Sequence, residues 1–185
     1  MPRWSKTNKL FEEHLAASLS GRFKMRATGY RQSHDRDGRV WFEFDGREVA
    51  DFSVEGFYAE VDRQVGIRDP DLSDWRMSRS DPQLRPRFFQ MRDELTEKLR
   101  LDGVVVLADF VQDLTLYFQM NHAEILSSPS AVIRALGMLD RRLGKRSLRA
   151  LTIGPEDPSP LVRRFLAIRY EAEGLRLNRD APSFT

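Results

Sequence analysis

"RVWFEFDGREVADF", residues 39–52, decides how the N-terminal part of this 185-residue chain folds. Two short runs rich in aromatic and β-branched residues flank the dipeptide Asp45-Gly46. Asp-Gly between such runs is a strong hairpin signal, because both central residues of a type I′ turn have positive φ. The stretch therefore predicts two antiparallel strands joined by a tight turn.

The register of this hairpin stays open between two alternatives. A two-residue turn places Glu43 opposite Glu48, which is a mild conflict of like charges. A longer turn with a glycine bulge offers Glu43 to Arg47 instead.

The flanking sequence extends the hairpin to a helix–strand–strand–strand–helix order. Residues 22–31 have strand composition and are followed by a second Asp-Gly, at 37–38. Apolar residues recur at helical spacing in residues 5–21, which end at Gly21, and residues 55–66 predict a short helix. We expect both helices to cover one face of the three-stranded sheet, because so small a sheet needs such cover.

The remainder of the chain has a different pattern. Residues 67–81 are polar and show no hydrophobic period, so they are predicted to form a linker, with Trp75 as its anchor. Residues 82–175 have helical periodicity throughout, and residues 176–185 form a tail. The predicted fold is α+β: an N-terminal helix, three-stranded antiparallel sheet and helix (1–66) packed on a C-terminal helical region (82–175).

Composition narrows the class of protein. Hydrophobic residues make up 41% of the chain and charged residues 31%, as in ordinary globular proteins. The chain has no cysteine, which excludes disulfides, thiolate metal sites and a cysteine nucleophile. The longest apolar run, residues 104–108, is far shorter than a membrane span, and the N-terminus is too charged for a signal peptide. We expect a cytoplasmic protein without a membrane partner.

Familiar catalytic signatures are missing from the sequence. It contains no Walker loop, G-x-S-x-G elbow, H-E-x-x-H pair or dinucleotide fingerprint. The stretch "HDRDG", residues 34–38, fails the spacing of a calcium loop, and His14 and His122 lack a second ligand at i+4. We therefore predict no catalytic residue, metal or cofactor, and an enzyme with an unfamiliar site remains an alternative.

A basic cluster offers the clearest candidate site. Residues 141–149 place five Arg or Lys side chains in nine positions. One interpretation is structural: Gly144 ends a helix, and cations in the last turn are stabilised by the helix dipole. The other is a patch for phosphate or an acidic partner. That candidate patch comprises Arg141, Arg142, Lys145, Arg146, Arg149, Arg163 and Arg164. The structural interpretation is favoured.

Charge is distributed unevenly along the chain. Residues 55–130 hold 14 acidic and 9 basic side chains, whereas residues 131–185 hold 6 and 11. The N-terminal element order matches a double-stranded-RNA-binding domain, but Glu55 stands where such domains carry lysine. The sequence favours a non-enzymatic protein that binds another protein, for example an inhibitor or immunity protein whose acidic middle segment meets a basic partner. The alternative is an RNA- or DNA-binding protein that uses the C-terminal arginine patch.

Four stretches carry a resemblance to known proteins. They are "WSK" (4–6), "GRVWFEFDGREVADFS" (38–53), "IRALGMLDRRLGKRSL" (133–148) and "LVRRFLAIRYEAEGL" (161–175). Together they resemble a widespread family of uncharacterised bacterial cytoplasmic proteins, and "LDRRLGKR" and "EAEGL" are its more specific parts. The resemblance implies a bacterial source and a shared fold. It assigns no catalytic residue, because the family has no established activity.

Overall fold

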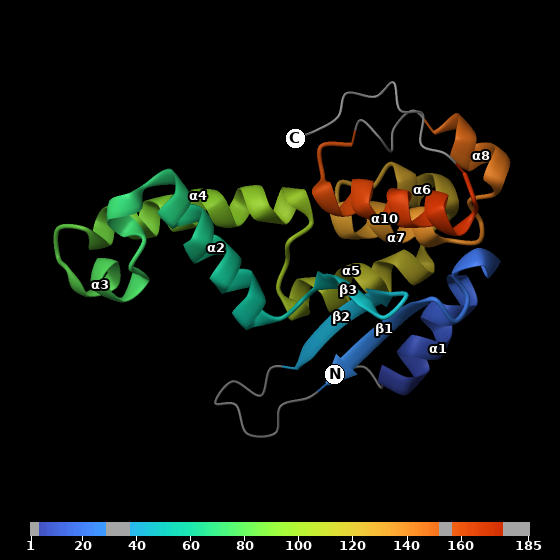
Figure 1. Cartoon of the computed structure of the whole chain (residues 1–185), viewed down its shortest axis with the longest axis horizontal. Helices are drawn as coiled ribbons and strands as arrows, with labels where there is room; N and C mark the ends of the chain where they lie inside the picture. The colour runs from blue at the N-terminus through green and yellow to red at the C-terminus, as the bar shows by residue number, and fades with distance from the viewer. Residues whose placement is uncertain (1–3, 29–37, 152–156, 176–185) are drawn as a thin grey trace.

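The computed structural model describes residues 4–28, 38–151 and 157–175, and it confirms the predicted α+β fold (Figure 1). The first elements in chain order are α1 (Trp4–His14), the 3-10 helix η1 (Ala17–Leu19), β1 (Phe23–Thr28), β2 (Arg39–Phe44), β3 (Arg47–Asp51), α2 (Val54–Arg68), the 3-10 helix η2 (Pro70–Leu72), α3 (Trp75–Ser80) and α4 (Arg85–Asp102). They are followed by α5 (Leu107–Gln119), α6 (His122–Leu126), α7 (Ala131–Leu139), α8 (Lys145–Ala150) and α10 (Pro160–Ala172).

The hairpin of β2 and β3 has the two-residue turn. Asp45 and Gly46 have φ angles of 49° and 78°, as a type I′ turn requires, and Glu43 lies opposite Glu48. The register shifts by one residue immediately beyond that pair, so the bulge lies in β3 at Val49 and not in the turn. The turn predicted at 37–38 includes Asp37, which lies outside the described residues.

Neighbouring cations neutralise the two facing carboxylates. Glu43 accepts hydrogen bonds from Arg26 at 3.1 Å and from the indole of Trp41 at 2.9 Å. Glu48 accepts one from Arg39 at 2.6 Å. The like-charge conflict expected for this register is therefore offset by two cross-strand arginines and by the indole of Trp41, which lies on the same strand as Glu43.

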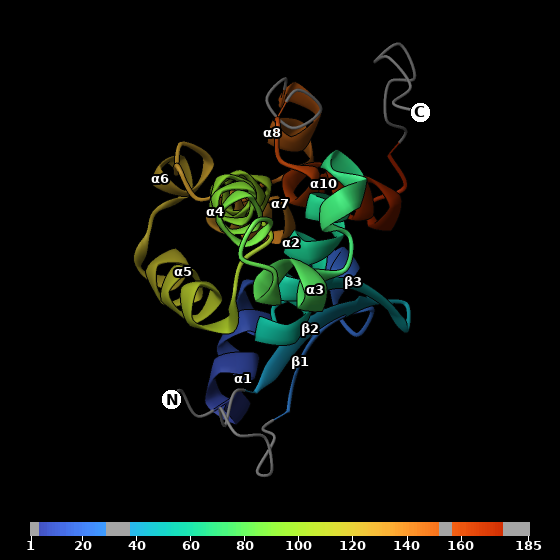
Figure 2. The same ribbon diagram turned by 90° about the vertical axis from the view of Figure 1, so that its left-hand side faces the viewer.

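The main core lies under the inner face of the sheet, whose strand order is β1-β2-β3. Phe42 of β2 is fully buried at its centre. It packs against five other phenylalanine rings, those of Phe11, Phe23, Phe52, Phe110 and Phe165. These rings show that α1, α5 and α10 cover the sheet, as Figures 1 and 2 also show.

The helix that follows β3, α2, does not cover the sheet as predicted. α2 starts at the N-cap Ser53, extends to Arg68 and packs on α4, away from the sheet. With α3 and α4 it forms a projecting arm, residues 54–102, that extends from the main body (Figure 1). The arm has a second core of its own, made of Phe57, Val61, Val65, Leu72, Phe88, Leu95 and Leu99.

Residues 67–81 are not an unstructured linker. They form η2 and α3, which turn the chain at the far end of the arm. Leu72 is fully buried in the arm core, and Asp74 caps α3 by accepting hydrogen bonds from two backbone amides. One buried leucine and one capping carboxylate fix this segment, whose other large apolar residues, Ile67, Trp75 and Met77, are exposed.

Two predicted helices also differ in extent. The first ends at His14 rather than Gly21, and η1 completes the connection to β1. The helix predicted to end at Gly144 is two helices, because α7 ends at Leu139 and α8 begins after Gly144. The predicted tail, residues 176–185, lies outside the described residues.

Candidate protein-binding surface

The fold divides the basic patch predicted from the sequence. Arg163 and Arg164 lie near the N-terminal end of α10, where both donate hydrogen bonds to backbone carbonyls. Lys145 lies at the other end, where its amino group is 2.8 Å from the carboxylate of Glu173. At 1.5 Å per residue, about 13 Å of helix separates Arg164 from Glu173. The seven basic residues therefore do not form one continuous surface.

The predicted structural explanation of the cluster is also wrong in part. Gly144 has a φ of −71° and is the N-cap of α8, not the residue that ends α7. Lys145 and Arg146 consequently lie in a first helical turn, where the dipole disfavours cations. The physical reason is Asp140, which ends α7 four residues earlier by turning its carboxylate into the protein.

Asp140 is the centre of a buried polar network. Its side chain has no exposed surface and accepts hydrogen bonds from Arg142 at 2.6 Å and from the hydroxyl of Tyr117 at 2.7 Å. Burial would raise the pKa of Asp140, but the hydrogen bonds from Arg142 and Tyr117 outweigh burial and hold that pKa below its ordinary value. Burial, together with Asp140, raises the pKa of Tyr117. The carboxylate is thus ionised and fully paired.

A second group of charges extends this network to α10. Glu173 is 3.0 Å from Arg169 and 2.8 Å from Lys145, and it accepts a hydrogen bond of 2.7 Å from Ser18. Arg169 is itself buried and donates to backbone carbonyls that follow α7, including that of Leu143 at 3.1 Å. The stretches "LDRRLGKR" and "EAEGL" therefore pack together. Five ionised groups here have partners of opposite charge, which indicates a structural network: Asp140, Arg142, Lys145, Arg169 and Glu173.

Three exposed members of the predicted patch lack a salt-bridge partner in the described part of the chain. Arg141, Arg146 and Arg149 have no carboxylate within salt-bridge distance among the described residues. They are the remainder of the patch that could meet an anion.

The two histidines in the described ranges, His14 and His122, belong to no cluster of metal ligands. Nowhere in residues 4–28, 38–151 and 157–175 do three or more His, Cys, Asp or Glu side chains gather as metal ligands would. Nδ1 of His14 lies 2.8 Å from the carbonyl oxygen of Leu10. Burial lowers the pKa of His122, which favours its neutral form. Most of the "HDRDG" stretch, residues 34–37, lies outside the described residues.

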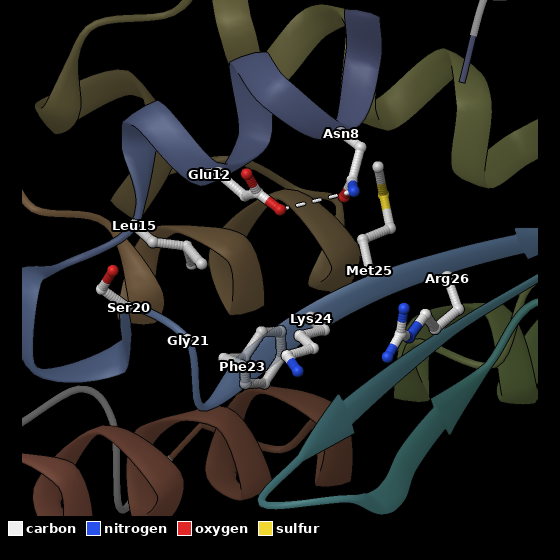
Figure 3. Close-up of a pocket in the computed structure, with 9 residues that line it drawn as sticks. All are labelled: Asn8, Glu12, Leu15, Ser20, Gly21, Phe23, Lys24, Met25 and Arg26. Carbon is white, nitrogen blue, oxygen red and sulfur yellow. Dashed lines mark hydrogen bonds between the residues drawn. The ribbon is translucent and has the colours of Figure 1, made fainter. Parts of the chain in front are cut away.

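Two open hollows lie beside α1. One, of about 310 Å³, separates α1 from β1 and is lined by both elements (Figure 3). The other, of about 300 Å³, lies between α1 and α5 and includes Leu10, Leu114 and Phe118 in its lining. Among the described residues that line the two hollows, Glu12 alone carries a carboxylate, so these residues offer no pair of acids for catalysis.

The strongest accumulation of exposed apolar surface is on the arm. Seven large apolar residues are exposed among those described, and five belong to residues 54–102. These five are Tyr58, Ile67, Trp75, Met77 and Leu101. Ile67, Trp75 and Met77 are 61%, 40% and 52% exposed and lie where α2, η2 and α3 meet, at the far end of the arm (Figures 1 and 2). We call these three residues the apolar tip.

The local structure holds the apolar tip in place. The guanidinium groups of Arg76 and Arg79 lie 5.3 and 5.6 Å from the ring of Trp75, within cation–π distance. The Cα of Gly66 faces Ser73 closely enough that a Cβ at Gly66 would come within 3.2 Å of it. The end of α2 is therefore pressed against the segment that leads into α3.

Three of the eleven acidic side chains of the arm form salt bridges with its own arginines. Salt bridges join Glu60 to Arg63 at 2.6 Å, Asp62 to Arg92 at 3.4 Å, and Asp69 to Arg87. The charge available to a partner is thus smaller than the sequence count suggests. The tip offers chiefly apolar surface, which sequence analysis missed because it assigned these residues to a linker.

Comparison with known proteins supports the family resemblance. A sequence model of the SF0329 protein family matches residues 3–170. Neither the curated proteins nor the solved structures show a match to the chain. Within the described ranges, no helix has both the length and the apolar character needed to cross a membrane.

Proposed function

We propose that this chain, which belongs to the SF0329 protein family, binds another protein through the apolar tip of its α2–α4 arm. The observation that carries the proposal is the exposure of Ile67, Trp75 and Met77 together at the end of a projecting element. Exposed apolar residues gathered at one place mark interaction sites, whereas singly scattered ones need no explanation.

The composition of the tip favours a protein as the partner. Tryptophan is among the residues that most often dominate the energy of protein interfaces, and methionine is enriched in them. The guanidinium groups of Arg76 and Arg79 lie over the ring of Trp75, so less side-chain entropy is lost when a partner buries it.

The arm is also built to present this surface rigidly. Its separate core keeps α2, α3 and α4 together. At the base, Ser159 donates a hydrogen bond of 2.7 Å to the carbonyl of Asp102, and a Cβ at Gly103 would come within 2.7 Å of Leu161. A preorganised surface of this kind binds without a large ordering cost.

The proposal is tested with two matched variants of the tagged full chain in a lysate of its host cell. The tip variant carries Ile67→Ser, Trp75→Ser and Met77→Ser. The control carries Leu10→Ser and Leu116→Ser, which remove exposed apolar residues outside the arm.

We expect the wild type and the control to retain the same protein in stoichiometric amount, and the tip variant to lose it. Melting curves establish that both variants are folded. Equal recovery by the tip variant would contradict the proposal, and recovery of RNA or DNA in place of protein would favour the nucleic-acid alternative.

A further inference from the structure

Three exposed arginines accompany the apolar tip. Arg68 directly follows Ile67, and the guanidinium groups of Arg76 and Arg79 lie 5.3 and 5.6 Å from the ring of Trp75. In the described part of the chain, no carboxylate lies within salt-bridge distance of these three arginines. Their guanidinium donors are therefore free to bind an anionic group of a partner.

The carboxylates of the same segment are mostly engaged within the chain. Asp69 is buried and forms a salt bridge with Arg87. One oxygen of Asp74 accepts hydrogen bonds of 3.0 and 3.2 Å from two amides in the first turn of α3, and one oxygen of Asp81 binds two amides that precede α4. Among the four aspartates of residues 67–81, Asp71 alone has no interaction with a described residue. The unpaired charge beside the tip is therefore chiefly positive.

The balance of charge also changes along the arm. Its far end, residues 67–87, holds five basic and four acidic side chains, whereas residues 54–66 and 88–102 together hold four basic and seven acidic ones. Within the arm, the acidic excess of the sequence therefore lies away from the tip (Figure 1).

We infer that the partner of the apolar tip presents an acidic segment, whose apolar residues cover the tip while its carboxylates pair with Arg68, Arg76 and Arg79. This inference rests on the proposed function and adds the chemistry of the partner. Arginine suits the role because its planar fork donates two parallel hydrogen bonds to one carboxylate. The result differs from the basic partner that the charge of the middle segment suggests.

Two features of the tip favour an acidic protein segment over a nucleic acid. Ile67 and Met77 supply aliphatic surface, whereas single-stranded nucleic acids bind along basic grooves on which aromatic side chains stack with successive bases. The tip has one aromatic residue, Trp75. Asp71 is exposed beside it and would repel a phosphate backbone.

The direct probe is a displayed library of random peptides of about twelve residues, selected on the immobilised full-length chain. Peptides that the wild type retains and the tip variant (Ile67→Ser, Trp75→Ser and Met77→Ser) does not retain depend on the tip. We expect these peptides to combine several carboxylates with at least one large apolar residue. Their mean net charge should be more negative than that of the unselected library.

Two charge-reversal variants separate local charge from overall charge. Each replaces three exposed arginines that have no carboxylate partner among the described residues, so the net charge changes equally. The tip-charge variant carries Arg68→Glu, Arg76→Glu and Arg79→Glu, and the control carries Arg141→Glu, Arg146→Glu and Arg149→Glu.

Binding of a fluorescent copy of the most enriched tip-dependent peptide is then measured by anisotropy. We expect the tip-charge variant to bind it at least about tenfold more weakly than the wild type, and the control to stay within about twofold. Added salt should weaken binding to the wild type, because exposed charges are screened.

Several results would overturn the inference. Tip-dependent peptides that are neutral or basic would do so, and so would an equal loss of affinity in both charge-reversal variants. An RNA of about ten nucleotides that binds the wild type more tightly than the peptide, and that the tip variant does not bind, would assign the arginines to nucleic acid instead. The absence of any tip-dependent peptide would contradict the proposed function, and this inference with it.

Circular dichroism shows whether the variants are folded. If the tip-charge variant is unfolded, the composition of the peptides selected by the wild type still decides the question.

Discussion

The hydroxyl of Tyr117 donates a 2.7 Å hydrogen bond to the carboxylate of Asp140. This bond joins the C-terminal part of α5 to the residue that ends α7, in a place from which solvent is excluded. Arg142 supplies the opposite charge from the next turn of the chain. The "LDRRLGKR" stretch is therefore explained in large part by the need to end α7 on a buried, ionised carboxylate.

Because Asp140 is ionised in the folded protein, we expect its contribution to stability to depend on pH. Its pKa is held below the ordinary value of the unfolded chain, about 3.9, so its contribution to the free energy of unfolding is complete above that pH and is lost as pH falls through the folded-state pKa. We expect the stability difference between the wild type and Asp140→Asn to be constant above about pH 5 and to shrink below about pH 4. Urea unfolding at a series of pH values measures it. A difference that grows toward low pH would contradict the assignment.

The basic run separates into residues with a carboxylate partner and residues without one, which can be distinguished by mutation. Arg142→Gln leaves a buried carboxylate without its cation and should cost about 1.5–3 kcal/mol. Replacing Arg141, Arg146 and Arg149 together with Gln should change stability by less than about 0.5 kcal/mol for each substitution. Denaturation curves test both. A salt-dependent affinity for nucleic acid that this triple variant loses would support the alternative function.

Substitutions of Gly46 should change stability through the backbone conformation of the turn and not through side-chain clashes. A Cβ at Gly46 would meet no atom within 4 Å, but the φ of 78° is strained for other residues. Gly46→Val should lower the unfolding free energy by more than about 1 kcal/mol, and Gly46→Asn by less, because asparagine tolerates positive φ. A melting temperature unchanged by valine would show that the turn is not demanding.

Local signals predicted the elements that local chemistry determines. The Asp-Gly turn at 45–46 and the three strands each depend on a few adjacent residues. The N-terminal extent of α2 was also predicted, since its apolar face repeats at helical spacing. Helical spacing does not indicate which surface the apolar face of α2 will cover. The packing of α2 on α4, and not on the sheet, therefore could not be predicted from the sequence.

The candidate site depended on tertiary contacts that the sequence does not display. In residues 67–81 a single buried leucine, Leu72, orders the segment, and one apolar residue produces no period. Trp75 therefore seemed to anchor a linker, whereas it is one of the exposed residues of the tip. The basic patch is divided because Asp140 is buried. In the sequence, a carboxylate within a basic run resembles a surface residue, so this burial could not be predicted.

Because the arm has a hydrophobic core of its own, we predict that it can unfold locally while the main body stays folded. Leu72 is fully buried in the arm core, so Leu72→Ala should cost about 2–4 kcal/mol, within the range for buried leucines. Amide hydrogen exchange should accelerate in residues 54–102 and little elsewhere. Leu139→Ala, in the main core, is the comparison and should accelerate exchange in α7 and α10. Uniform acceleration by Leu72→Ala would mean that the two cores unfold as one.

Site-specific photo-crosslinking in the host cell tests most directly whether the arm tip contacts a protein partner. A photoreactive phenylalanine analogue replaces Trp75 in one variant and Leu116, an exposed residue of α5, in another. We predict a discrete protein adduct from position 75 that is absent from position 116, and that disappears when Ile67→Ser and Met77→Ser are added. An adduct from position 116 alone, or the same adduct from both positions, would contradict binding through the tip.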